Sequence, residues 1–254
     1  MRPPVIAAVA VAVALAAGAY FWFFRGDRAP DSAATAPAPT AVEVEPQTTE
    51  RPAPLPVTVP PLGESDPLVR QLVAALSSHP AIAAWLTTDG LIRNFVVVVD
   101  NIASGASPTR HLRVLRPTGP FATAGDAEDL RIDPRSFARY DRIADAAASI
   151  DANGAASLYA TLDPRLEEAY QELGNQDGFD TALQRALTAL LRVPVIDEDE
   201  PVQFKGALVA YSDPRLESLT PAQKQLLRMG PRNVRIIQNK LREIAAALGM
   251  RVSG

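Results

Sequence analysis

Cysteine is absent from this chain of 254 residues, histidine occurs only twice, and aromatic residues make up 6% of the total. Without cysteine there can be no disulfide bond, thiol nucleophile, iron–sulfur cluster or Cys-ligated zinc. With only His79 and His111, we expect neither a multi-histidine metal site nor a catalytic histidine relay. The phosphate-binding, dinucleotide-binding, serine-hydrolase and zinc-protease motifs are also missing. We therefore predict that the protein uses no metal and no cofactor. A protein without catalytic activity is favoured over an enzyme.

A long hydrophobic run stands at the start of the chain. Residues 5–24 carry no charge, and a helix of that length, at about 1.5 Å per residue, spans the roughly 30 Å core of a bilayer. Five aromatic residues end the run at 20–24, and Arg25 follows them, as at a membrane interface. We predict a transmembrane signal anchor at 5–24 after a short tail, 1–4. A cleaved signal peptide and a buried core helix are the alternatives. Cleavage near Gly18 would leave an aromatic-rich N-terminus, which favours the anchor.

The flanking charges leave the orientation of this segment nearly balanced. Arg2 and the terminal amine precede it, whereas Arg25 and Arg28, offset by Asp27, follow it. A very short leading tail resembles that of signal anchors, which leave the N-terminus in the cytosol. The Ala/Pro/Arg-rich composition favours a Gram-negative source, in which the bulk of the chain would then lie in the periplasm. We predict a single-pass protein of the inner membrane with its C-terminal domain in the periplasm, and the lipid bilayer as partner of residues 5–24.

Residues 25–63 contain nine prolines and are predicted to be a linker. Proline at this density favours polyproline II, in which the segment could extend to roughly 120 Å at about 3.1 Å per residue. A proline-rich ligand motif at 52–56 is the alternative to a plain spacer.

Residues 64–254 are predicted to form a compact, mainly α-helical domain with a small accessory β element. Asp-Pro occurs at 66, 133, 163 and 213 and Thr-Pro at 220, and each pair is typical of a helix start. Strands are expected at 121–123, 129–132 and within 202–211. The expected helices cover 66–76, 81–86, 90–103, 134–150, 155–173, 179–191, 214–219, 221–229 and 232–248.

Four segments of this domain are similar to a known family. They are residues 77–86, 89–101, 132–141 and 226–233, and together they resemble the proteobacterial family called domain of unknown function 3014. The resemblance covers about residues 66–249. It implies an N-terminal anchor and a Pro-rich tether, and it assigns no catalytic residue.

Charge is unevenly distributed in the domain. Residues 64–219 hold 14 Lys and Arg against 23 Asp and Glu, whereas residues 220–254 hold 7 against 1. The last helix should dock an apolar seam on the core and expose a cationic stripe that includes Arg232, Arg235 and Arg242. The stripe could pair with the acidic remainder, bind anionic lipid or glycan, or bind nucleic acid. We rank these in that order, and nucleic acid is the least favoured partner.

One candidate site emerges where polar residues could converge around the turn at 229–233. If they do, they form a polar pocket, although a buried structural hydrogen-bond network is the stronger alternative. Its candidate residues are Arg93, Asn94, Asp100, Asn101, Arg135, Tyr140, Arg228, Arg232 and Asn233.

The function predicted from these observations is that of an anchored binding or scaffold module for an envelope protein or glycan, whose oligomeric state the sequence leaves open. A second hypothesis is a hydrolase of an envelope polymer that uses carboxylates from the acidic half of the domain. A third is a cytosol-facing module that uses the basic C-terminal helix.

Overall fold

The computed structural model describes residues 52–126, 128–196, 200–206 and 208–252. The predicted transmembrane segment at 5–24 and most of the linker lie outside these residues. Within the described ranges, no helix is both long and apolar enough to cross a bilayer.

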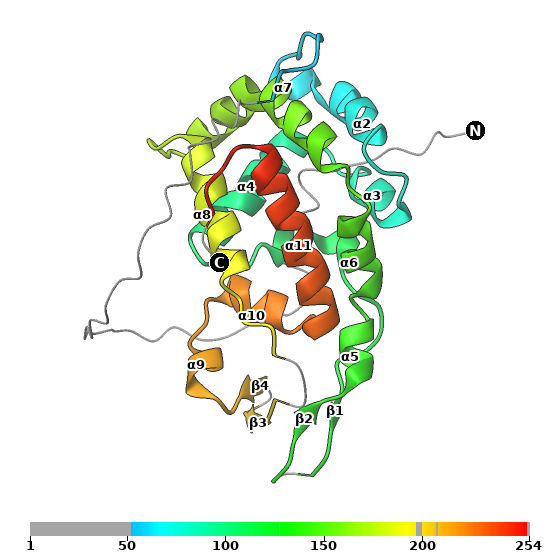
Figure 1. The fold of residues 1–254 in the computed structure, drawn as a ribbon, viewed down its shortest axis with the longest axis vertical. Helices are drawn as coiled ribbons and strands as arrows, with labels where there is room; N and C mark the ends of the chain where they lie inside the picture. The colour runs from blue at the N-terminus through cyan, green and yellow to red at the C-terminus, as the bar shows by residue number, and fades with distance from the viewer. Residues whose placement is uncertain (1–51, 127, 197–199, 207, 253–254) are drawn as a thin grey trace, which may run out of the picture.

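The described chain is mainly helical, as predicted, and Figure 1 shows its arrangement. The α-helices are α2 (Asp66–Ala74), α3 (Pro80–Trp85), α4 (Leu91–Ala103), α5 (Pro134–Ala138), α6 (Asp141–Ala148), α7 (Ala152–Gln171), α8 (Phe179–Leu191), α9 (Pro214–Glu217), α10 (Pro221–Leu227) and α11 (Pro231–Ala247). Short 3-10 turns are η2 (Leu62–Glu64), η3 (Thr109–His111) and η4 (Arg113–Leu115).

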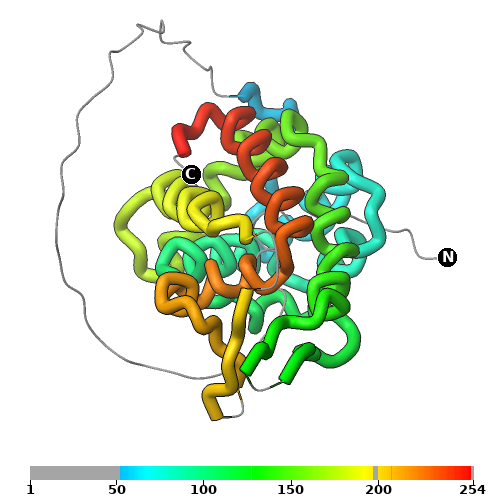
Figure 2. Tube along the Cα trace, turned by 60° about the horizontal axis from the view of Figure 1, so that its bottom comes forward, coloured from blue at the N-terminus to red at the C-terminus, as the bar shows by residue number. Residues whose placement is uncertain are grey.

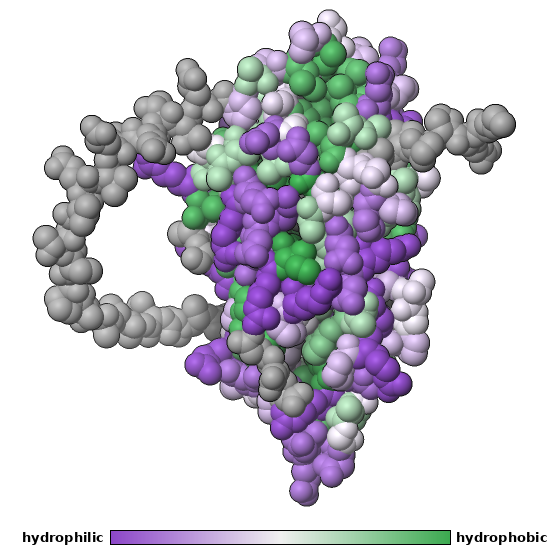
Figure 3. All heavy atoms as spheres, turned by 45° about the vertical axis from the view of Figure 1, so that its right-hand side comes forward, coloured by the Kyte–Doolittle hydropathy of each residue, from purple (hydrophilic) through white to green (hydrophobic). Residues whose placement is uncertain are grey.

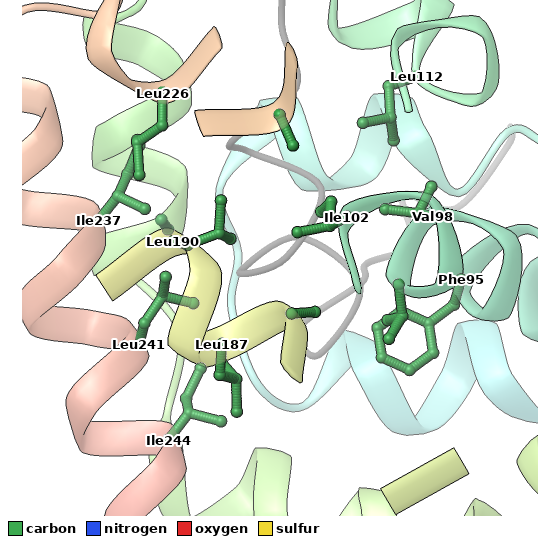
Figure 4. Close-up of a cluster of buried hydrophobic side chains, with 14 of the residues drawn as sticks. Phe95, Val98, Ile102, Leu112, Leu187, Leu190, Leu226, Ile237, Leu241 and Ile244 are labelled. Carbon is green, nitrogen blue, oxygen red and sulfur yellow. The ribbon is translucent and has the colours of Figure 1, made fainter. Parts of the chain in front are cut away.

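The core is built around α8, which packs between α4 and α11. Figure 4 shows Leu187 and Leu190 of α8 lying between the apolar side chains of these two helices. α7 contacts α4, α8 and α11, and α6 covers the far side of α11. The apolar seam predicted for the last helix is buried in this core and consists of Val234, Ile237, Leu241, Ile244 and Leu248. Burial of that seam, at about 25 cal/mol per Å² of apolar surface, holds α11 in place.

Two short hairpins form the accessory β element. β1 (Thr123–Ala124) pairs antiparallel with β2 (Arg131–Ile132), and β3 (Val202–Lys205) pairs antiparallel with β4 (Leu208–Tyr211). A bridge between Arg131 and Pro201 joins the hairpins, which lie side by side at the lower end of the domain (Figures 1 and 2). Hydrophilic side chains cover the tip of this end in the face shown in Figure 3.

The helix predicted over 134–150 is divided in the structure. α5 ends at Ala138, and α6 begins at Asp141 after a turn at Arg139 and Tyr140. Asn233 of α11 explains the break, because its Nδ2 donates to the carbonyl of Phe137 at 3.1 Å and to Asp141 Oδ1 at 3.0 Å. A side chain inserted at the end of a helical ladder interrupts it. The sequence of 134–150 alone contains no sign of this insertion.

The Asp-Pro pairs correctly predict a helix start at three of four positions, since α2 begins at Asp66, α5 at Pro134 and α9 at Pro214. Asp133 and Asp213 cap α5 and α9 by accepting from the backbone amides two residues on. Thr220 forms a full capping box with Gln223. Pro164, by contrast, lies inside α7, so the helix start predicted at 163 is wrong. Packing of α7 against α4, α8 and α11 outweighs the local preference of proline for a first turn.

Asp66 has a different role from the one its Asp-Pro pair predicts. Ser65 is the N-cap residue of α2, and Asp66 accepts from the amides of Gly90 at 2.8 Å and Leu91 at 2.9 Å. Gly90 is the N-cap of α4 and has no side chain with which to cap that helix itself. The start of α4 is therefore capped from a neighbouring helix.

Residues 52–61, expected to belong to the linker, contact the helical domain along α7. The amide of Leu55 donates to Thr161 Oγ1 at 2.7 Å, and Arg165 Nε donates to the carbonyl of Pro60 at 3.0 Å. Val59 packs against the core, and Leu62 is buried in it. In Figure 1 this strap, residues 52–61, lies at the upper end of the domain, opposite the hairpins.

Candidate functional site

The four candidate residues of α4 are not gathered at one point. Arg93 makes a two-point ion pair with Glu172, with atoms 2.5 and 2.8 Å apart, on the surface. Asn94 donates to the carbonyl of His111, Asp100 accepts from the side chain of Asn175, and Asn101 donates to a carbonyl of its own helix. Each of these side chains has a separate structural partner. Arg135 is also separate, since it is largely exposed and pairs with Asp133.

The remaining four candidates lie where α5, α6, α10 and α11 meet, and two of them form a structural network. Arg232 binds Asp145 at 3.0 Å and Asp141 at 3.3 Å on α6. Asn233 is 1% exposed and donates to the carbonyls of Phe137 and Met229 and to Asp141. These bonds join the start of α11 to α6. The side chains of Arg232 and Asn233 are therefore used to hold the fold together.

The other two candidates, Tyr140 and Arg228, belong to a cluster that includes residues absent from the sequence-based set. The guanidinium of Arg139 lies 5.7 Å from the centre of the Tyr140 ring, and that of Arg228 lies 5.8 Å from the centre of the Tyr211 ring. The phenol of Tyr140 is hydrogen-bonded to the side chain of Gln225. We call these five residues the arginine–tyrosine cluster.

Three separate parts of the chain supply the cluster. Arg139 and Tyr140 form the turn between α5 and α6, Tyr211 ends β4, and Gln225 and Arg228 come from α10 and its C-cap. Arg228 also joins the hairpin to α10, because its Nη2 donates to the carbonyl of Val209 at 2.9 Å. The cluster therefore lies at the joint between the helical core and the β3–β4 hairpin, in the lower half of Figure 1.

Burial controls the ionisation of both phenols. Tyr140 and Tyr211 are 3% and 2% exposed, and loss of hydration raises the pKa of each above its ordinary value of about 10. The positive charge of Arg228 opposes the rise in pKa at both residues without cancelling it. Both phenols are neutral at physiological pH, so they can donate hydrogen bonds but are poorly suited to act as bases.

Several donors of the cluster have no partner. The Nε and Nη1 atoms of Arg139 and the hydroxyl of Tyr211 are buried and make no hydrogen bond. Among the described residues, no ion pair involves Arg139 or Arg228. Buried polar groups in proteins are paired in the great majority of cases, so unpaired groups that share one cluster call for an explanation.

Two further buried side-chain atoms of the described residues make no hydrogen bond. They are Trp85 Nε1 on α3 and Asn94 Oδ1 on α4. His79 caps α3 through Nδ1, which accepts from the amide of Ala81, and burial lowers its pKa. Burial also lowers the pKa of His111, with the charge of Arg110 acting in the same direction. Across the described ranges, no group of three or more acidic or histidine side chains could hold a metal ion.

Sequence reasoning missed Arg139, Tyr211 and Gln225. Arg139 stands beside the candidate Tyr140 in a segment that carries the family resemblance, so that adjacency could have drawn attention to it. Nothing in the sequence near Tyr211 indicates that it faces α10 across the hairpin.

A family match decides the relationship of this chain to other proteins. Residues 91–245 match the family described as protein of unknown function (DUF3014). The chain belongs to this family. The DUF3014 match runs from the start of α4 into α11 and includes all five residues of the arginine–tyrosine cluster. The searches of curated proteins and of solved structures found no match.

Proposed function

We propose that this chain is a binding module of the cell envelope, anchored in the inner membrane by residues 5–24 and carrying its helical domain in the periplasm. The charge-free run at 5–24 and the nine prolines of residues 25–63 support the anchoring part of the proposal.

The observation that carries the binding part is the composition of the arginine–tyrosine cluster. Its guanidinium groups are permanently cationic, and its phenols are held neutral by burial, which raises their pKa. Side chains of this kind hold a ligand through fixed charges and hydrogen bonds, and they are poor nucleophiles or general bases at neutral pH. The cluster thus favours binding over catalysis.

Membrane fractionation of the full chain tests the anchor. The wild-type chain should remain in the membrane pellet after a high-salt wash. The double variant Val13→Arg, Leu15→Arg should move to the soluble fraction, because each arginine opposes insertion at the centre of a span by about 2.5–3.5 kcal/mol. The matched control Thr48→Arg, Thr49→Arg adds the same charge to the linker and should stay in the pellet.

Protease added to spheroplasts tests the orientation. Degradation of the domain with the membrane intact supports a periplasmic location. Protection of the domain would overturn that location and favour the third hypothesis, a cytosol-facing module.

A further inference from the structure

We propose that the arginine–tyrosine cluster is the binding site for an oxyanionic group, a carboxylate or a phosphate, on the ligand of this protein. The proposal rests on the binding function proposed above and names the chemistry of its ligand.

The unpaired atoms of the cluster are all hydrogen-bond donors when the phenol is neutral. Arg139 presents Nε and Nη1, and Tyr211 presents its hydroxyl. An oxyanion has two or more acceptor oxygens and can accept two parallel charge-assisted hydrogen bonds from one edge of a guanidinium, either Nε with Nη2 or Nη1 with Nη2. One oxyanion at Arg139 would therefore satisfy one of its two unpaired nitrogens, and further oxygens of the ligand would serve the other nitrogen and the hydroxyl of Tyr211.

The charges around the cluster favour an anion. Arg139 and Arg228 bring two positive charges without an ion-pair partner among the described residues. Two carboxylates, those of Glu200 and Glu217, also act on the phenol of Tyr211 and raise its pKa. That of Glu217 is occupied, because Lys224 Nζ lies 2.8 Å from its Oε1 and the amide of Tyr211 donates to its Oε2 at 3.1 Å. The buried Nε and Nη1 atoms of Arg139 lack hydrogen-bond acceptors, and an anion would supply an acceptor.

The same arrangement disfavours other kinds of ligand. A cation would be repelled by both guanidinium groups. A sugar or an aromatic ring would need an accessible ring face for stacking, whereas Tyr140 and Tyr211 are buried and one face of each ring lies against Arg139 or Arg228. Arg139 is only partly buried as a residue, so the cluster reaches the surface on that side.

The test compares the thermal midpoint of the full chain in detergent micelles with inorganic phosphate, acetate or chloride at equal ionic strength. At least one of the two oxyanions should raise the midpoint above that in chloride, as a ligand of the native state does. Stabilisation by phosphate alone would identify a phosphate group as the source, and stabilisation by acetate alone a carboxylate.

Three variants connect the effect to the cluster. Arg139→Met should weaken the oxyanion dependence at least about tenfold in apparent affinity, as expected for loss of charge-assisted bonds. Tyr211→Phe should weaken it about three- to tenfold while melting in chloride at or above the wild-type temperature, because the hydroxyl removed has no partner. Arg135→Met, which removes an exposed arginine of the same α5 region, is the matched control and should behave as the wild type.

Two results would overturn the inference. They are equal midpoints in phosphate, acetate and chloride, and an oxyanion effect that Arg135→Met abolishes as strongly as Arg139→Met. Neither result affects the membrane fractionation, so failure of the anion site and failure of the proposed anchoring can be told apart.

Discussion

Gly230 separates α10 from α11 with a φ of 85°, and a Cβ placed on it would lie 2.5 Å from Cγ and 2.7 Å from Cβ of Phe137. Two constraints therefore act on one residue. The backbone conformation is unfavourable for any side chain, and the base of a neighbouring side chain, which has little freedom to move, fills the space.

Gly230→Ala is expected to lower the free energy of unfolding by about 2–5 kcal/mol, the sum of backbone strain and overpacking. Gly174→Ala is a control for a positive φ without the steric contact, because Gly174 has a φ of 86° and nothing within 4 Å of the added carbon. It should cost about 1–2 kcal/mol. Urea denaturation measures both, and equal losses would show that contact with Phe137 contributes nothing.

His79 gives the protein a predictable response to acid. Its Nδ1 accepts from Ala81, and burial lowers its pKa below the ordinary value of about 6.5. The native state thus binds fewer protons than the unfolded state. The stability that this group contributes is complete above about pH 6.5 and is lost as the pH falls toward the lowered pKa.

His79→Asn isolates this contribution, since asparagine can cap α3 without titrating. Unfolding free energies measured from pH 8 to pH 5 should show the wild type losing stability relative to the variant. Part of the acid dependence should remain in the variant because His111 also has a lowered pKa. Parallel pH profiles for the two proteins would contradict the role assigned to His79.

At the scale of elements, the start of α4 depends on Asp66 of α2. Asp66→Ala should lower the free energy of unfolding by about 1–3 kcal/mol, because the amides of Gly90 and Leu91 lose their acceptor. Asp89→Ala removes a fully exposed carboxylate beside the same helix and should change stability by less than about 0.5 kcal/mol. Chemical denaturation compares the two, and equal effects would contradict capping across helices.

Most helices and strands could be predicted from the local sequence. The residues and elements that each of them contacts could not. The apolar spacing of α8 predicted a helix at 179–191, which is where the structure places it. The helix predicted at 90–103 is confirmed as α4, because its apolar residues share one face even though residues 96–99 are all β-branched. Such patterns are local and depend on residues a few positions apart.

The errors arise where a distant residue intervenes. Asn233 breaks the predicted helix 134–150 from 96 residues away at Phe137, and Asp66 caps a helix 24 residues further on. Prediction of the candidate site fails for the same reason. Arg228 and Tyr211 meet only because a hairpin folds back on α10, and no local pattern specifies that approach.

At the scale of the whole molecule, the strap at 52–61 should be able to detach from α7 with little effect on the stability of the core. Arg165→Ala removes the bond to Pro60 and a longer one of 3.5 Å to Val59, so limited proteolysis within the strap should become faster. Global stability should fall by less than about 1.5 kcal/mol, the contribution of a typical hydrogen bond. Arg185→Ala, which breaks a surface ion pair of α8, is the control and should leave strap cleavage unchanged.

The position of the strap also determines how the domain would respond to force. Under the anchoring proposed above, tension on the chain from the membrane side would enter at Thr161 and Arg165, and α7 would pass it to the helices packed against it. The hairpins and the joint that holds them to α10 lie at the opposite end of the domain (Figure 1). With a ligand held at the arginine–tyrosine cluster, as proposed, tension between the anchor and the ligand would act on the two ends of the domain and would be carried by the helical core between them.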